Sequence, residues 1–196
     1  MTESGVGPDG TQVRDFEDID SDDVDRVAVA AFTEFEERYD DWPVMAAELG
    51  TMSRLAEVGE VIVAETGGHV CGAVAYIPPH QVKADYFDPG WPVIRMLVVD
   101  PAYRGAGIGR ALTEACIDRA RRDRSDAIAL HTSPIMTVAL PMYRRMGFRF
   151  ARDAPPIHGV AYAVYVKSLK QGSYVVPTGA PTFTDELVEF EDDKGR

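Results

Sequence analysis

The most informative part of the sequence is LVVDPAYRGAGIGRALTEAC, residues 97–116. It opens with the end of an apolar run that starts at residue 93, and such a run is typical of a central strand. Apolar side chains then recur with the period of one helix face, at Ile108, Ala111, Leu112, Ala115, Cys116 and Ala120. Three glycines stand between the two patterns, at positions 105, 107 and 109. The sequence therefore predicts a strand, a glycine-rich turn and a helix in direct succession.

The glycine-rich turn has the properties of an anion-binding site. A helix start leaves several backbone N–H groups without partners, and the positive end of the helix dipole lies behind them. Glycine lets a phosphate group approach these amides closely, and Arg104 and Arg110 add positive charge on either side. A tight turn without any ligand is the alternative interpretation. We expect a pyrophosphate to bind at this position.

Two common nucleotide-binding motifs do not match this turn. A P-loop requires G-x-x-x-x-G-K-[ST], and the lysine of that pattern is missing here. A dinucleotide-binding fold requires G-x-G-x-x-G and an acidic residue at the end of the next strand. This chain has G-x-G-x-G instead, and its next predicted strand ends in His131 and Thr132. Binding of ATP or NAD at the turn remains an alternative interpretation, although neither motif is complete here.

The other hydrophobic patterns indicate a single domain in which helices and strands are mixed. Expected helices cover residues 21–35, 43–58 with an interruption near Gly50, 108–122 and 136–148, and expected strands lie within 11–20 and over 60–66, 69–77, 93–99, 127–132 and 160–169. Prolines and glycines mark residues 78–92 as a long loop. A second loop is expected around Pro155, Pro156, Ile157 and His158. Residues 1–10 are predicted to be disordered, and residues 171–196 form an acidic C-terminal tail.

The charge of the chain limits its partners. The net charge is −12, but it is unevenly spread. Residues 1–41 carry 14 acidic and 3 basic side chains, whereas residues 42–170 carry 12 acidic and 15 basic ones. Such an acidic protein is not expected to bind nucleic acid as its main partner. The apolar runs are shorter than the roughly 18 residues of a membrane span, and the first residues lack a signal-peptide pattern. We therefore expect no membrane partner and a cytoplasmic protein.

Cysteine usage also indicates a cytoplasmic protein. The two cysteines, Cys71 and Cys116, lie in an apolar run and in a helical pattern. Neither has the spacing of a metal-ligand pair, and two buried thiols are typical of a reduced interior. We expect neither a disulfide nor a bound metal.

Two segments together resemble one known family. Residues 104–109, RGAGIG, match the R/Q-x-x-G-x-G/A loop of the GNAT superfamily of N-acetyltransferases, and ALPMYRRMGF, residues 139–148, matches a second motif of that family. The resemblance extends from about residue 11 to about residue 169, within a predicted domain of residues 11–170. It implies an α/β (α+β) fold with a mixed, mostly antiparallel central sheet of six to seven strands, about four helices and a splayed central strand pair.

The resemblance also implies a cofactor site for acetyl-CoA. In the family, the glycine-rich loop binds the pyrophosphate of coenzyme A, and the strand before it has a bulge that exposes backbone groups to the pantetheine arm and the thioester. The matching loop residues here are Arg104, Gly105, Ala106, Gly107, Ile108, Gly109 and Arg110, and the matching strand residues are Leu97, Val98 and Val99. No metal is implied.

The implied reaction is direct attack of a substrate amine on the acetyl thioester in a ternary complex. Tyr143 matches the tyrosine that protonates the leaving thiolate, and a phenol with a pKa near 10 carries its proton at neutral pH. Two departures affect this assignment: Met136 replaces an asparagine that is frequent in the family, and Pro141 is expected to bend or delay the helix, which leaves open whether Tyr143 is displaced.

The sequence leaves the general base and the acceptor open. His131 is the first candidate for the base, with His80, Asp85, Asp88 or a water chain as alternatives. The acidic and aromatic stretch of residues 32–42, FTEFEERYDDW, suits a cationic amine, but it is also typical of a solvated helix end. A peptide N-terminus, a lysine, a polyamine, an aminoglycoside and a small amine all remain possible acceptors.

Two further hypotheses concern the protein as a whole. A fold of this kind can also serve as a non-catalytic sensor or interaction module that binds acyl-CoA. The family commonly dimerises through its C-terminal strands, and residues 160–169 are a candidate for such an edge.

Overall fold

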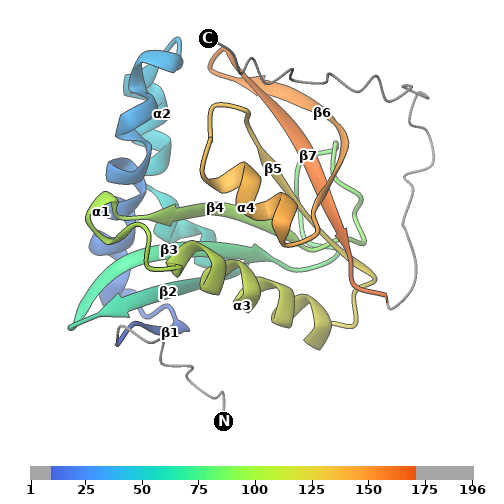
Figure 1. Ribbon diagram of the computed structural model, residues 1–196, viewed down its shortest axis with the longest axis horizontal. Coiled ribbons are helices and arrows are strands. Elements are labelled where there is room, and N and C mark those ends of the chain that lie inside the picture. The colour runs from blue at the N-terminus through green and yellow to red at the C-terminus, as the bar shows by residue number, and fades with distance from the viewer. Residues whose placement is uncertain (1–9, 171–196) are drawn as a thin grey trace, which may run out of the picture.

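A computed structural model describes residues 10–170, and the fold is that of a mixed α/β domain (Figure 1). The predicted disordered start and the acidic C-terminal tail lie almost entirely outside these residues. The elements are β1 (Gln12–Asp15), η1 (Asp18–Asp20), α1 (Ser21–Phe32), η2 (Thr33–Arg38), α2 (Trp42–Leu49), η3 (Met52–Glu57), β2 (Glu60–Thr66), β3 (His69–Ile77), β4 (Val93–Val99), η4 (Pro101–Tyr103), α3 (Ile108–Arg122), β5 (Ala127–Thr132), α4 (Ala139–Arg145), β6 (Arg149–Ile157) and β7 (Val160–Ser168).

The seven strands form one sheet in the order β1-β2-β3-β4-β5-β7-β6. All neighbouring strands are antiparallel except β4 and β5, which are parallel. Helices cover both faces of this sheet: side chains of α1 and α2 pack in one apolar cluster, and side chains of α3 and α4 pack in another (Figure 1). The predicted fold class, with a mostly antiparallel sheet of six to seven strands and about four α-helices, is confirmed.

The predicted splay of the central strands is also present. Only two residues of β4 pair with β5, in the register Val93↔Ala129 and Ile94↔Leu130. The pairing of β4 with β3 then shifts by one residue, because Met96 and Leu97 together oppose a single residue of β3. Met96 has a φ of 53°, in the left-handed region, which marks a β-bulge. Beyond the bulge β4 continues beside β3, whereas β5 and β7 turn away from it (Figure 1).

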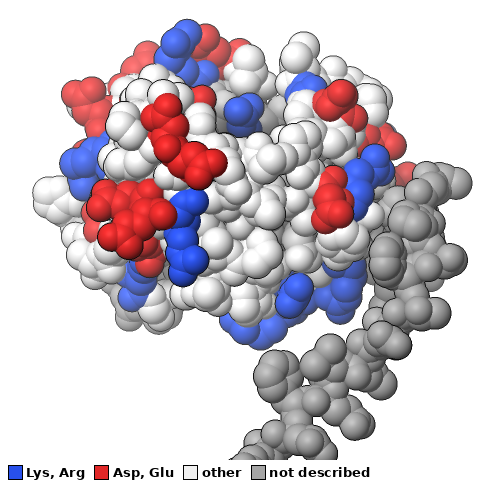
Figure 2. Space-filling model, turned by 90° about the horizontal axis from the view of Figure 1, so that it is seen from above, with Lys and Arg blue, Asp and Glu red and all other residues white. Residues whose placement is uncertain are grey.

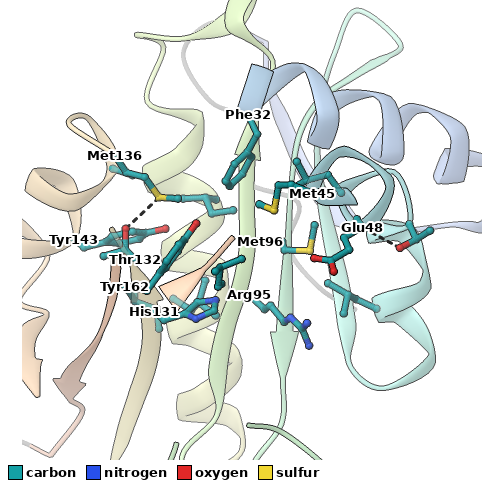
Figure 3. Close-up of a pocket in the computed structure, with 18 residues that line it drawn as sticks. Phe32, Met45, Glu48, Arg95, Met96, His131, Thr132, Met136, Tyr143 and Tyr162 are labelled. Atoms are coloured by element: carbon teal, nitrogen blue, oxygen red, sulfur yellow. Dashed lines mark hydrogen bonds between the residues drawn. The ribbon is translucent and has the colours of Figure 1, made fainter. Parts of the chain in front are cut away.

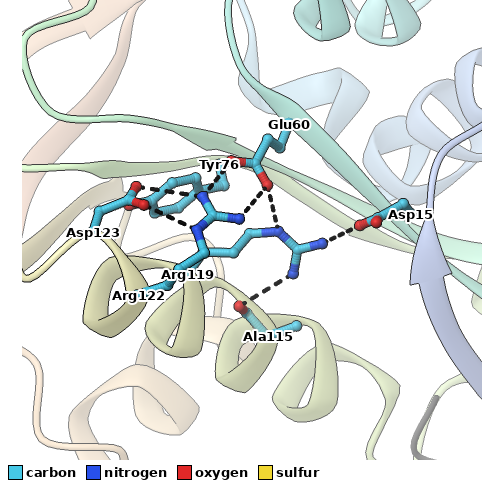
Figure 4. Close-up of polar contacts among 7 residues, drawn as sticks. All are labelled: Asp15, Glu60, Tyr76, Ala115, Arg119, Arg122 and Asp123. Carbon is cyan, nitrogen blue, oxygen red and sulfur yellow. Dashed lines mark hydrogen bonds and ion pairs between the residues drawn. The ribbon is translucent and has the colours of Figure 1, made fainter. Parts of the chain in front are cut away.

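A network of ion pairs fixes the C-terminal half of α3 to the sheet (Figure 4). The Glu60 carboxylate of β2 accepts hydrogen bonds from Arg122 at 2.5 Å and from Arg119 at 2.9 Å. Arg119 also donates to Asp15 of β1, and the Tyr76 hydroxyl of β3 donates to Asp123 at 2.7 Å. Three strands are thereby linked to one helix. The network holds α3 in place, so that its N-terminus has a defined position beside β4.

Residues 149–157 differ from the prediction, because they form strand β6 where a loop was expected around the two prolines. Pro155 and Pro156 fall in an irregularity of the pairing with β7, between Ala154 and Ile157, and β6 is an edge strand. Proline is tolerated there because no neighbour requires its missing N–H group. Strand β7, in contrast, pairs with β5 and β6 on its two sides. The candidate dimer edge at residues 160–169 is therefore wrong.

The remaining elements lie close to their predicted positions. The second helix is interrupted near Gly50 as expected, since α2 ends at Leu49 and η3 follows. Helix α4 begins at Ala139, three residues later than predicted. Cys71 and Cys116 are both buried, free thiols. Within residues 10–170, no helix combines the length and the apolar character that a membrane span requires.

Candidate active site

The splay of β4 and β5 opens a central cleft of about 390 Å³ (Figure 3). This size falls within the range of small-molecule sites. Its lining comes from α1, α2, the segment around η3, β4, β5, the start of α4, β6 and β7: Phe32, Met45, Glu48, Leu49, Thr51, Leu55, Ile94, Arg95, Met96, Leu97, Leu130, His131, Thr132, Met136, Ala139, Tyr143, Ile157 and Tyr162.

The cleft joins the two faces of the sheet. Leu97, Ala139 and Tyr143 belong to the apolar cluster of α3 and α4, whereas Phe32, Met45 and Met96 belong to the cluster of α1 and α2. All of these side chains line the same space. Two ligands can thus meet between the splayed strands, one from each face of the sheet.

The glycine-rich loop forms the predicted strand–turn–helix, and α3 begins within it, at Ile108. Gly105 and Gly107 have φ values of 86° and 81°, a conformation that favours glycine over every other residue. The first amide of α3 with a helical partner is that of Ala111, which donates to the Gly107 carbonyl at 3.0 Å. The amides before it therefore have no partner within the helix, as expected for a helix start. Space is open around Gly105 and Gly107, since a Cβ atom on either would have no neighbour within 4 Å.

The other residues of the loop have structural partners. Arg104 reaches back to the end of α1, where it pairs with Glu34 at 2.6 Å and donates to the Ala31 carbonyl at 2.9 Å. Arg110 forms an exposed ion pair with Glu114 at 2.9 Å. Ile108 is buried in the core, Ala106 is exposed, and Gly109 lies against the side chains of Leu97, Val99 and Met142. The expected positive charge is present at the loop, but both arginines already have acidic neighbours.

Tyr143 lies on α4 and lines the cleft from the side of α3 and α4; the helix is delayed before Pro141, as expected. Because the helix begins at Ala139, Pro141 falls in its first turn, where a helix tolerates a missing N–H group. The Tyr143 ring packs edge-on against Phe148 at 5.7 Å. Burial raises the pKa of the Tyr143 hydroxyl well above its ordinary value. The phenol is therefore protonated throughout the neutral range. Met136 lies nearby, and its sulfur accepts from Thr132 at 3.3 Å.

His131 lies on the opposite side of the cleft, where aromatic rings surround it. The Tyr86 hydroxyl is 3.3 Å from its Nδ1 atom, and the ring centroids of Phe87 and Tyr162 are 5.9 and 5.3 Å away. Burial, together with the positive charge of Arg95, lowers the pKa of His131 to about 4. The imidazole is therefore neutral at physiological pH. The structure brings His131 and Tyr143 together in one cleft.

The alternative bases from the long loop do not share this cleft. His80 and Asp88 line a separate hollow, which also includes Trp91 and residues 123–126. The Asp88 carboxylate accepts from the Gly90 amide at 2.8 Å and so shapes the loop itself. Asp85 is also absent from the lining of the central cleft. Among these histidines and aspartates, the geometry favours His131.

The acidic stretch of residues 32–42 has structural roles instead of lining the cleft. Among its acids, Glu34 pairs with Arg104, and Asp41 accepts from the Val44 amide at 3.2 Å and so caps α2. Only Phe32 of this stretch lines the cleft. In Figure 2, acidic side chains gather over the side of α1 and α2, and a largely uncharged area lies beside them. The second interpretation of this stretch, a solvated helix end, fits the structure.

Sequence reasoning missed two charged residues of the cleft, Glu48 on α2 and Arg95 on β4. Arg95 had a detectable signal, because it is a single charge in the middle of the apolar strand VIRMLVV. A charge in a central strand is costly unless it faces water or a ligand. Glu48 had no such signal, since acids are common on exposed helix faces.

The strand splay, the glycine-rich loop and the shared cleft define a GNAT-like α/β fold. The family model described as "Acetyltransferase (GNAT) family" matches residues 21–148, and the chain belongs to this family.

Curated relatives and solved structures agree with this assignment. N-alpha-acetyltransferase 30 of Saccharomyces cerevisiae is 44% identical over 55 residues, which span 28% of this chain and 31% of the yeast protein. The IAA acetyltransferase of Azospirillum brasilense is 30% identical over 126 residues, 62% of this chain and 76% of that protein. The structure of the acetyltransferase yncA from Salmonella typhimurium with its cofactor acetyl-CoA has a TM-score of 0.61 at 18% identity, and the match covers 84% of this chain and 96% of that one.

Proposed function

We propose that this protein is an N-acetyltransferase that transfers the acetyl group of acetyl-CoA to a primary amine by direct attack within a ternary complex. The observation that carries the proposal is the cleft between β4 and β5, which connects the glycine-rich loop side of the sheet with the side of α1 and α2. Membership of the GNAT family and the acetyl-CoA named with the yncA structure support the same cosubstrate.

The amides of the loop are the proposed binding site for the pyrophosphate. Unpaired N–H groups at the start of α3 point outward, and the helix dipole adds to their attraction for an anion. Gly105 and Gly107 leave the approach to these amides open. Arg110, whose ion pair with Glu114 is exposed, is close enough in sequence to turn toward the phosphates.

The free edge of β4 is the proposed binding site for the pantetheine arm and the thioester. Backbone groups of a strand alternate in direction, and the Asp100 amide donates to Cys71 of β3 at 2.9 Å. The Val99 amide therefore points to the opposite side, where β5 no longer pairs with β4. An amide in this position can donate to the thioester carbonyl and stabilise the oxyanion that forms during attack. The same alternation directs the Leu97 amide to this free edge and the Val98 amide toward Ala73 of β3.

The amine, which is cationic in water, first loses its ammonium proton to solvent. Its nitrogen then bonds to the carbonyl carbon, the carbon–sulfur bond breaks, and Tyr143 protonates the leaving thiolate and regains a proton from solvent. The raised pKa of Tyr143 keeps this proton available at neutral pH. The attacking nitrogen becomes more acidic once it has bonded to carbon, and the neutral His131 ring accepts its proton. Because the pKa of His131 is about 4, the ring then passes the proton to water.

Thiol release from acetyl-CoA with a panel of amines tests this function. We expect turnover with at least one amine, and we expect Tyr143→Phe to lower kcat by about 100-fold while acetyl-CoA still binds. Tyr165→Phe is a matched control, because Tyr165 is a buried tyrosine that does not line the cleft. Acetyl-CoA binding without turnover of any amine would contradict the proposal and favour the non-catalytic sensor. An unchanged rate in Tyr143→Phe across the pH range would refute the role of Tyr143.

A further inference from the structure

The guanidinium group of Arg95 lines the central cleft and has no partner among residues 10–170. Arg95 is the one lysine or arginine in the cleft lining that the structure describes. Within residues 10–170, neither an ion pair nor a hydrogen bond is formed by its side chain. Other arginines of the domain either pair with carboxylates, as Arg14 and Arg104 do, or lie outside the cleft, as do those at 38, 124, 145 and 152, which also form no ion pair within residues 10–170. Arg95 is therefore available to a ligand in the cleft.

The position of Arg95 is set by the bulge of β4. Arg95 directly precedes Met96, and both side chains line the cleft (Figure 3). Figure 3 shows the Arg95 side chain below Met96, on the other side of the β4 ribbon from His131, whose protonation it disfavours. The guanidinium is exposed and therefore acts from the rim of the cleft, only a few residues from the β4 edge where the thioester is expected.

The rest of this side of the cleft is mainly apolar. Phe32, Met45, Leu49, Leu55, Met96 and Ile157 supply its hydrocarbon and thioether surface. One carboxylate, that of Glu48, lies on the α2 side, 3.5 Å from His158 and largely exposed. A ligand that matches these groups has an apolar body, an anionic group for Arg95 and a cationic amine that Glu48 attracts.

We propose that the acceptor is a free amino acid with an apolar side chain, whose carboxylate is bound by Arg95. This inference rests on the proposed acetyltransferase function and names its substrate class. An amino acid carries its carboxylate one carbon from the amine, so that binding of the carboxylate also positions the nucleophile. The planar guanidinium can hold a carboxylate through two parallel hydrogen bonds. A polyamine or an aminoglycoside would bring further positive charge toward Arg95, and a lysine side chain in a protein has no carboxylate next to its amine.

Three ligands with the same side chain test the inference: leucine, leucinamide, in which an amide replaces the carboxylate, and isoamylamine, which lacks the carboxylate. The wild-type protein is expected to acetylate leucine with a higher kcat/KM than either of the other two. Arg95→Gln is expected to lower the ratio of kcat/KM for leucine to kcat/KM for isoamylamine by about 10- to 100-fold, the usual effect of losing hydrogen bonds to a charged group. The ratio is the readout because a change in the pKa of His131 affects both amines alike. Arg121→Gln is the matched control, because Arg121 lies exposed on α3 in an ion pair with Asp118.

Binding measurements separate this inference from the proposed function. Calorimetry of leucine with the coenzyme A-loaded protein should show binding that Arg95→Gln weakens and Arg121→Gln does not. That result supports the carboxylate site even if no acetyl transfer occurs, in which case only the transferase proposal fails. The inference is overturned if isoamylamine is acetylated as efficiently as leucine, if Arg95→Gln affects all three ligands equally, or if leucine binding does not depend on Arg95.

Discussion

The substitution Gly107→Glu tests the anion site at the start of α3. Gly107 has a φ of 81°, so any side chain there costs about 1–2 kcal/mol of folding free energy. No atom lies within 4 Å of the new Cβ position, so the side chain itself fits. A carboxylate about 4 Å from a phosphate repels it by about 4 kcal/mol at the effective dielectric constant of a protein surface. We therefore expect affinity for acetyl-CoA to fall by about 100- to 1,000-fold, which calorimetry would measure.

A second substitution separates charge at the site from strain in the backbone. Gly67, in the turn between β2 and β3, also has a positive φ of 59° and open space around it. Gly67→Glu therefore introduces the same charge and a similar strain outside the loop, and thermal unfolding should show similar losses of stability for both variants. Cofactor affinity should fall only in Gly107→Glu. Unchanged acetyl-CoA affinity in a folded Gly107→Glu protein, or an equal loss in Gly67→Glu, would refute the proposed pyrophosphate site.

Two further predictions concern ionisable groups. Arg122, aided by Arg119, holds the pKa of the Glu60 carboxyl below its ordinary value. The ionised carboxylate therefore stabilises the fold at any pH above the ordinary pKa, and this stabilisation is lost as the pH falls through the lowered pKa of the folded protein. Glu60→Gln should lower the free energy of unfolding, measured with urea, by about 1 kcal/mol at pH 7 and by less in acid. Substitution of the exposed Glu57 by Gln is the control and should change this free energy very little. A loss of stability that does not depend on pH would contradict the role of the Glu60 charge. By NMR, His131 should titrate near pH 4, and Arg95→Gln should raise this pKa by removing a positive neighbour; a normal pKa in the wild-type protein would refute its burial.

Local patterns were sufficient to predict most of the fold. The apolar run of β4, the glycines and the amphipathic pattern of α3 all follow from short-range sequence, and the structure contains each of them. Strand β6 escaped prediction because Pro155 and Pro156 are strong turn signals. Whether a proline segment forms a loop or an edge strand depends on the neighbouring strand, which local sequence does not reveal.

The candidate site was less predictable because distant parts of the chain meet there. The position of Tyr143 could be inferred from its motif, but the start of α4 after Val138, which places Pro141 harmlessly in the first turn, could not. The partners of Arg104 and the exclusion of His80 and Asp88 from the cleft depend on contacts across the fold. Arg95 and Glu48 come from segments 47 positions apart in the chain, and only the folded structure brings them to one cleft.

The bulge at Met96 amounts to a single extra residue in β4. If that residue were deleted, the strand could run in phase with β3 and straighten against β5, and the sheet could close into an unbroken surface. The side chains after the deletion would keep their faces, because Val98 would still lie opposite Ala73 of β3. One amino acid thus decides whether the sheet is continuous or has a cleft at its centre. If the protein without Met96 were still active, the cleft would not be needed for activity.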